Sequence, residues 1–111
     1  MEKTLGKISH ASFGLGGYQG AMIGIHIELS LDEGGVSCGK YQWDKNQIEC
    51  SKHAHWTELD RDRGYSDIVR YISDLLNDAK VNTIKDLVGI PVEATLNDGS
   101  LKEFRILTEV I

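Results

Sequence analysis

The strongest constraint on the fold is a strict alternation of apolar and polar residues over residues 22–31. Successive side chains of a β-strand point to opposite faces, so this period places all the apolar residues on one side. They are Ile23, Ile25, Ile27, Leu29 and Leu31. The segment is therefore predicted to be a half-buried antiparallel strand, with one face on a core and the other toward water.

A glycine-rich run, FGLGGYQG over residues 13–20, leads directly into that strand. Glycine at this density occurs where a turn needs a positive φ or where another group approaches the backbone closely. Residues 4–13 are expected to form a preceding strand, anchored in the core by Ile8 and Phe13. We expect residues 14–20 to be the loop of a wide hairpin that joins the two strands.

A second period, at helical spacing, runs through residues 68–79 and predicts an amphipathic helix with a single apolar stripe. The helix would begin either at Ser66 as N-cap or earlier, at Thr57. In the second case Gly64 predicts a break between two short helices. The stripe consists of Ile68, Val69, Ile72, Leu75, Leu76 and Ala79.

Further elements complete an α+β fold. A short strand is expected within residues 36–43, and a helical turn over residues 83–89, which Pro91 ends. Strands over residues 92–96 and 102–110 flank an Asp-Gly turn. The prediction is one domain, residues 1–111, with a single antiparallel sheet of four or five strands. Hairpins lie at both ends of the chain, and the helix packs on one face.

Composition limits the function. The 111 residues carry a net charge of −5, which argues against affinity for nucleic acid or for an anionic membrane. The two cysteines are expected to be reduced thiols in a cytoplasmic protein. No segment has the length and apolarity of a signal peptide or of a membrane span.

Several runs of the sequence together resemble a family. They are FGLGGYQGAMIGI, then Trp43 and Trp56, then LLNDAKVNTIKDLVGIPVEATL and SLKEFRILTEVI. The chain in these runs is similar to small uncharacterised proteins encoded in phage and prophage genomes. The resemblance covers most of the chain except about residues 32–60, from which it includes the two tryptophans. The resemblance implies an accessory factor of the host cytoplasm, and some such factors inhibit host defence by binding a protein or by sequestering a signal nucleotide.

The glycine run is the candidate binding site. It matches neither the Rossmann fingerprint nor a Walker A loop, because a strand follows it and no Gly-Lys-Ser/Thr is present. An aromatic and an amide at a glycine-flanked tip suit stacking and hydrogen bonding to a partner or a base. The alternative is a structural loop that lets Tyr18 fold over the sheet. The candidate residues are Gly14, Gly16, Gly17, Tyr18, Gln19 and Gly20, with Trp43 and Trp56 nearby.

A metal site and a catalytic site are disfavoured. Cys38, Cys50, His53 and His55 lack the tight Cys-x2–4-Cys pair with which structural zinc sites usually begin. Two unrelated thiols and two surface histidines are the favoured interpretation. No nucleophile elbow Gly-x-Ser-x-Gly occurs, and no pair of acids has the spacing of a catalytic dyad. We therefore expect no cofactor, no metal and no catalysis.

The sequence thus predicts a small non-catalytic binding protein. Its expected partner is a host or phage protein, and inhibition of a host defence system is the role that the resemblance implies. The alternative is an oligomer that sequesters a nucleotide or another small ligand through the glycine-rich loop. A homodimer is expected in either case, because both hairpins offer sheet edges. The long isoleucine-bearing strand is one candidate for such an edge, where it would pair with a second copy.

Overall fold

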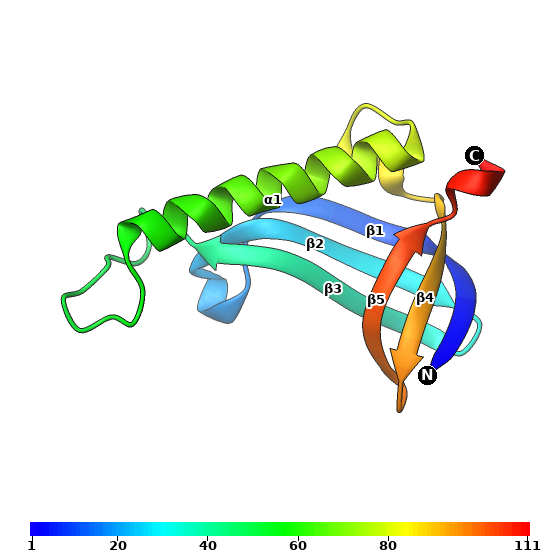
Figure 1. Cartoon of the computed structure of the whole chain (residues 1–111), viewed down its shortest axis with the longest axis horizontal. Helices are drawn as coiled ribbons and strands as arrows, with labels where there is room; N and C mark the ends of the chain where they lie inside the picture. Colours follow the sequence, from blue (N-terminus) through cyan, green and yellow to red (C-terminus); the bar gives the residue numbers. More distant parts are fainter.

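The computed structural model describes residues 1–111 and contains one antiparallel five-stranded sheet with a long helix on one face (Figure 1). The strand order in space is β3-β2-β1-β4-β5. This arrangement confirms the predicted α+β class, with a hairpin near each end of the chain. The strands are β1 (Glu2–Gly16), β2 (Met22–Leu31), β3 (Gly34–Trp43), β4 (Pro91–Asn97) and β5 (Ser100–Ile106).

The two hairpins meet over a short stretch only. β4 pairs with residues 2–7 of β1, whereas β2 pairs with β1 from Gly6 to Gly16. Strands β1, β2 and β3 therefore form a long arm, and β4 and β5 cross it at one end (Figure 1). The molecule measures 47 × 33 × 19 Å.

The isoleucine-bearing strand has the predicted alternation but not the predicted place in the sheet. Ile25, Ile27 and Leu29 are completely buried, as the period of two required. However, β2 lies between β3 and β1, so the expectation that it forms a sheet edge is wrong. A strand that is paired on both sides has no free backbone groups for a second copy.

A β-bulge divides β1 into two parts. The register with β2 shifts between Ile8 and His10, so that Ser9 is an extra residue on β1. The bulge puts Ile8 and Phe13 on the same face although they are an odd number of residues apart. Ile8 is buried as predicted, but Phe13 is 49% exposed, so the prediction that it anchors the core is wrong. The cause is that the helix packs on β3 and β2 and leaves this part of β1 uncovered.

The helix, α1 (Glu58–Ala79), begins at the earlier of the two predicted starts. Thr57 and Asp60 form a reciprocal capping box: the Thr57 N–H donates to Asp60 Oδ2 at 2.8 Å, and the Asp60 N–H donates to Thr57 Oγ1 at 3.1 Å. The predicted break at Gly64 is wrong, because the helix runs through it. A Cβ at this position would collide with the side-chain amide of Gln42. The three atoms nearest to this position all belong to this flexible side chain of β3.

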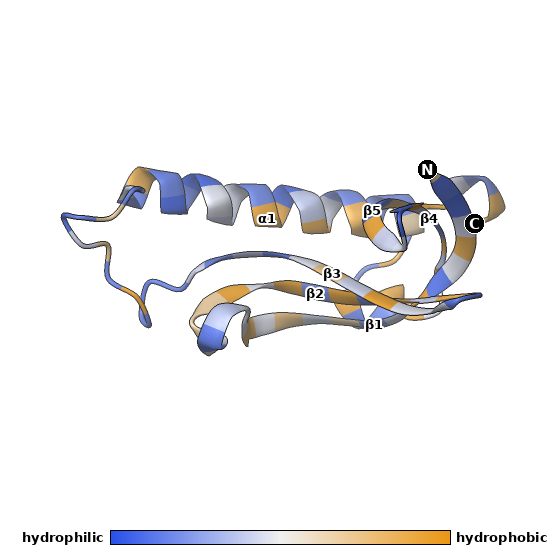
Figure 2. Cartoon of the chain, turned by 90° about the horizontal axis from the view of Figure 1, so that it is seen from below, coloured by the Kyte–Doolittle hydropathy of each residue, from blue (hydrophilic) through white to orange (hydrophobic).

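The core lies between α1 and the sheet. The helix turns its apolar side toward the strands (Figure 2), where Ile68, Leu75 and Ala79 are buried. Val69 belongs to the same predicted stripe but is 66% exposed. The buried cluster comprises Ile8, Ile25, Ile27, Leu29, Leu31, Leu75, Ala79, Leu87, Val92, Ala94, Leu96 and Ile106.

The carboxy-terminal strand is shorter than predicted. β5 ends at Ile106, and a 3-10 turn over Thr108–Val110 follows, where the sequence pattern predicted a strand up to residue 110. Arg105 donates hydrogen bonds to both carboxylate oxygens of Glu109 at 3.0 Å, and to Glu93 at 3.1 Å. These bonds hold the turn against β4 and β5. The Arg105 guanidinium also lowers the pKa of the Glu109 carboxyl from its ordinary value.

The face of the sheet away from α1 has no layer over it, and glycines and one tyrosine shape it. Gly14 and Gly24 are opposite each other on β1 and β2, and Tyr41 on β3 is opposite Gly24. A Cβ at Gly24 would collide with the Lys40 carbonyl oxygen and lie 2.8 Å from the Tyr41 ring. A Cβ at Gly14 would meet no atom within 4 Å. The Tyr41 ring therefore needs glycine at residue 24 to lie flat on the sheet.

This difference predicts opposite effects of the same substitution at two cross-strand neighbours. Gly24→Ala should lower the free energy of unfolding by about 2 kcal/mol, because backbone and the Tyr41 ring must shift. Gly14→Ala should raise it by less than about 1 kcal/mol, because alanine restricts only the unfolded chain there. Urea unfolding followed by circular dichroism measures both. Equal losses in the two variants would contradict the close approach at Gly24.

Candidate functional site

The hairpin between β1 and β2 ends in a short, well-defined tip. Gly14 and Gly16 lie within β1, where Gly16 is opposite Met22. The prediction of a wide loop over residues 14–20 is therefore wrong in its first half. The turn itself is a 3-10 turn, η1 (Tyr18–Gly20).

Three residues of this tip have left-handed backbone angles. Gly17 has a φ of 66°, Gln19 of 52° and Gly20 of 70°. The Gly20 N–H donates to the Gly17 carbonyl at 3.3 Å, and the Ala21 N–H donates to the Tyr18 carbonyl at 3.0 Å. These bonds give the tip one conformation. They also occupy two of the amides that an anion-binding nest would have needed.

Tyr18 projects from the tip into solvent. Its side chain is 65% exposed, and Gln19 is also exposed. The Tyr18 ring lies 6.2 Å from the Trp43 ring, centroid to centroid, with an interplanar angle of 88°. This is the edge-to-face geometry that aromatic pairs prefer. The structure thus joins two of the predicted site residues, and it does not fold Tyr18 away into its own subunit.

Three elements fix the position of Trp43. It is opposite Met22 at the end of the β2–β3 pair. The Tyr65 hydroxyl, from α1, donates a hydrogen bond to the Trp43 carbonyl at 2.8 Å. The next residue along the chain, Asp44, donates its N–H to the Ala21 carbonyl at 3.0 Å and so ties the end of β3 to the tip. These contacts hold the Trp43 backbone, and its ring lies beside the exposed Tyr18 ring.

Trp56, which was predicted to lie near the same site, contacts a different partner. Its ring stacks on the guanidinium of Arg61, with 4.6 Å between Arg61 Cζ and the ring centroid. Arg61 is only 1% exposed, and none of its side-chain nitrogens has a hydrogen bond within the chain. Its Nε lies 2.9 Å from Glu58 Oε1, an ion pair without hydrogen-bond geometry. Trp56 and Glu58 thus balance this buried charge.

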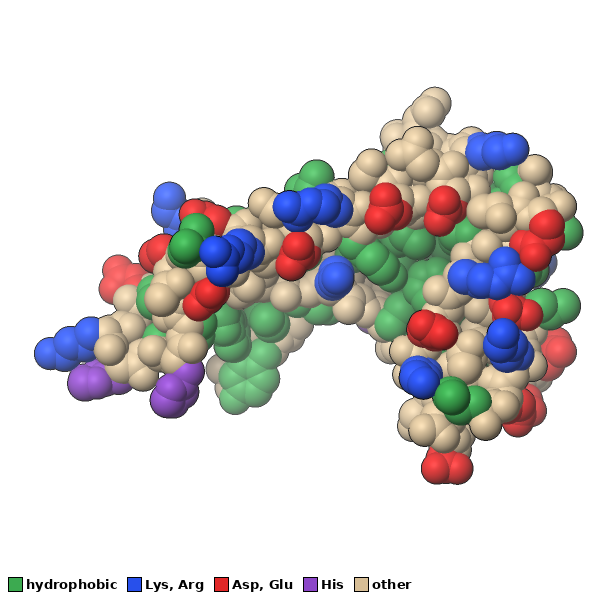
Figure 3. Space-filling view, in the orientation of Figure 1, with side chains coloured by type: hydrophobic (Ala, Val, Ile, Leu, Met, Phe, Trp, Pro, Cys, Tyr) green, Lys and Arg blue, Asp and Glu red, His purple; other side chains and the backbone are tan.

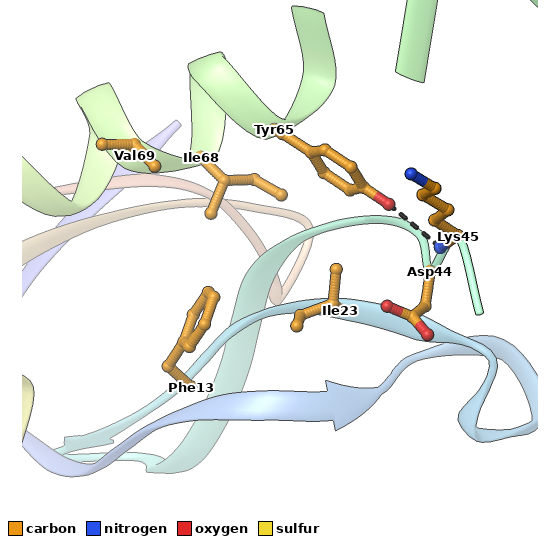
Figure 4. Close-up of a pocket in the computed structure, with 7 residues that line it drawn as sticks. All are labelled: Phe13, Ile23, Asp44, Lys45, Tyr65, Ile68 and Val69. Carbon is orange, nitrogen blue, oxygen red and sulfur yellow. Dashed lines mark hydrogen bonds between the residues drawn. The ribbon is translucent and has the colours of Figure 1, made fainter. Parts of the chain in front are cut away.

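A second feature, which no sequence pattern predicted, is an apolar cleft of about 300 Å³ between α1 and the sheet (Figure 4). The strands line one side of this cleft with Phe13 and Ile23. The helix lines the other side with Ile68 and Val69. At one end the Lys45 N–H donates to the Tyr65 hydroxyl at 3.1 Å. One sequence signal could have predicted this cleft: the apolar stripe of the helix is wider than the strands beneath the helix can cover.

The candidate zinc ligands do not converge. In the whole chain no three or more His, Cys, Asp or Glu side chains are grouped so that they could hold a metal ion. The Cys50 thiol donates to the Trp56 carbonyl at 3.2 Å. Cys38 lies on β3, where burial raises the pKa of its thiol. A raised thiol pKa opposes the thiolate that a zinc site requires.

Tyr71 on α1 lies in the same partly buried layer as Cys38. Burial, with a smaller effect from Cys38, raises the pKa of Tyr71 to about 12. The ammonium of Lys40 lies 5.3 Å from the centroid of the Tyr71 ring. Because the charged form of Tyr71 is disfavoured in this partly buried layer, the contact between α1 and the sheet is sensitive to alkaline pH.

Comparison of the chain with models of protein families, with curated proteins and with solved structures finds no match. The class that the fold and the site define is thus a small α+β protein with an exposed aromatic tip. No helix of the chain is both long enough and apolar enough to span a bilayer. On the surface seen in Figure 3, acidic and basic side chains are interspersed along α1 and over β4 and β5.

Alkaline pH should destabilise the fold through Tyr71. Tyrosine titrates at about 10 in the unfolded chain and at about 12 here, so the unfolded state loses its proton first as the pH rises. The contribution of Tyr71 to the free energy of unfolding is fully present below pH 10. It is lost as the pH rises from 10 to 12. Tyr71→Phe should lose less stability across this range, as urea midpoints at each pH would measure. Parallel losses in both proteins would contradict the role of burial.

Proposed function

We propose that this chain is a small non-catalytic binding protein that contacts a partner protein through the tip around Tyr18. The observation that carries this proposal is the exposed Tyr18 ring, which lies edge-to-face with the Trp43 ring. Isolated exposed apolar residues are common, but an exposed tyrosine beside a second aromatic ring on an uncovered sheet face is typical of binding surfaces.

Energetics support a protein as the partner. Tyrosine and tryptophan are enriched among the few residues that dominate the affinity of protein interfaces. A tip that already has one conformation loses little entropy when it binds, so more of the contact energy appears as affinity. Gln19, next to Tyr18 and also exposed, adds an amide that both donates and accepts hydrogen bonds.

The nucleotide-binding alternative has weaker support. A phosphate would need several free amides or a cation, and two of the tip amides already bond to the tip's own carbonyls. A thermal-shift measurement with cyclic and linear nucleotides tests it, since a ligand that binds only the folded state raises the melting temperature.

The identity of the partner is the finer part of the proposal. The resemblance to phage and prophage proteins is its only ground, and it favours a host or phage protein in the host cytoplasm. Within that group, a component of a host defence system is the partner that we propose, with inhibition by direct contact as the mode of action.

Loss of the tip side chains should strongly weaken binding without affecting the fold. A host lysate is passed over the immobilised protein, the captured protein is identified, and its affinity for the purified chain is measured by calorimetry. Tyr18→Ala with Gln19→Ala should weaken this affinity at least about 30-fold, which corresponds to about 2 kcal/mol. Because both side chains are exposed, the melting temperature should stay unchanged.

Leu5→Ala is the matched control, because Leu5 is 58% exposed on β1 but lies far along the strand from the tip. It should bind like the unchanged chain. Unchanged affinity in the double variant would overturn the proposed function. A melting temperature lowered by several degrees would assign the tip a structural role instead.

A further inference from the structure

Half of β1 has an unpaired edge. β4 pairs with residues 2–7 only, and residues 10–16 pair with β2 on one side and with no strand on the other. Where β4 leaves β1, the Ile8 N–H donates to the Ile90 carbonyl at 3.0 Å, and the Gly89 N–H donates to the Ile8 carbonyl at 2.7 Å. Beyond this point the open edge of β1 has no backbone partner.

The direction of these bonds shows which backbone groups are free. Ile8 points both its N–H and its carbonyl away from β2. Directions alternate along a strand, and the bulge at Ser9 adds one residue, so Ala11, Phe13 and Leu15 point the same way as Ile8. The N–H and carbonyl groups of these three residues thus face the open edge.

This edge lacks the usual protection against pairing. Natural edge strands carry charges, proline or a cover that blocks another strand. The other two edges of the sheet follow this rule, because β3 carries Lys40 and β5 carries Lys102, Glu103 and Arg105. Residues 10–16, HASFGLG, contain no Asp, Glu, Lys, Arg or Pro.

Exposed apolar side chains lie beside the same edge. Phe13 is 49%, Leu15 59% and Val69 66% exposed. Phe13 and Val69 line the cleft between β1 and α1 (Figure 4). Backbone groups that need partners and apolar groups that need cover therefore coincide at one place on the molecule.

We propose that a second copy of the chain occupies this edge, with the two β1 strands antiparallel about a two-fold axis at Phe13. In this register the three residues with free backbone groups meet one another: Phe13 faces Phe13 of the other copy, and Ala11 faces Leu15. Each such pair exchanges two N–H···O=C bonds. The two sheets become one, and both α1 helices lie on the same face above a shared apolar floor.

The segment is complementary to itself. The large Leu15 is opposite the small Ala11, and on the other face Ser12 is opposite Gly14, so two large side chains meet only at the axis. Each chain carries a net charge of −5, so two copies repel except where charges are absent, and residues 10–16 are such a place. The charged residues that line the cleft together with Phe13 are one acid and one base, Asp44 and Lys45.

A charge placed on the edge tests the proposal. Sedimentation equilibrium over a concentration series should give twice the chain mass for the unchanged protein. Leu15→Lys should shift this to the monomer mass at the same concentrations, because two ammonium groups would be buried. Leu59→Lys is the matched control, because Leu59 has the same 59% exposure but lies in the first turn of α1. It should remain dimeric and melt as the parent does. Leu15→Lys should keep the circular dichroism spectrum of the folded chain but melt at a lower temperature, because it loses the stabilisation that association gives.

A cysteine on the axis tests the register. Opposed residues of antiparallel strands have Cα atoms about 5.5 Å apart when they are hydrogen-bonded, which is within the range of a disulfide. In a background with Cys38→Ala and Cys50→Ser, Phe13→Cys should form a covalent dimer under mild oxidation. Leu59→Cys in the same background should not.

A parent protein that is monomeric up to millimolar concentration would overturn the proposal and would leave the edge to a strand of another protein. A dimer that survives Leu15→Lys would overturn it as well, because the interface would then lie elsewhere. The Tyr18 and Gln19 double variant should keep the dimer mass, which separates this surface from the proposed binding tip.

Discussion

The coverage that one helix can give a sheet determines both the core and the exposed surfaces of this protein. Neighbouring strands are about 4.8 Å apart, and a helix with its side chains is about 10 Å wide, so one helix covers roughly two strands. α1 packs on β3 and β2, and it contributes Ile68 and Leu75 to the core. The distal half of β1 therefore keeps Phe13 in contact with solvent although its side chain faces the same way as the buried isoleucines.

The other face of the sheet has no second layer at all, so its peptide groups must be covered in a different way. The Tyr41 ring lies against the backbone at Gly24 and Gly39, and this contact covers peptide groups without a second layer of helices. At the tip, on the same face, the Trp43 ring lies edge-to-face with the Tyr18 ring. Glycine thus has two separate roles here: Gly24 and Gly39 allow a ring to pack closely within the sheet, and Gly17 and Gly20 adopt the positive φ angles of the turn.

Local patterns predicted what depends on local geometry. The alternation in β2, the helical stripe and the Asp-Gly turn of the last hairpin are confirmed, because periods of 2 and 3.6 residues follow from the backbone alone. The errors at Phe13 and Gly64, and in the edge position of β2, all concern what lies next to an element. The bulge at Ser9 and the apolar cleft depend on strand order and helix placement, which no short window of sequence contains.

Tip and free edge are neighbours in sequence, and this has a geometric consequence for function. In the proposed dimer the axis passes through Phe13, so each Tyr18 would lie five residues from it, at opposite ends of the paired strands. At about 3.3 Å per residue the two tips would be roughly 30 Å apart. A partner that is itself a dimer, or that carries two copies of an epitope, would then be bound at two points, and the second contact would form at high effective concentration. The strand that joins the subunits would thereby also set the spacing of their binding surfaces.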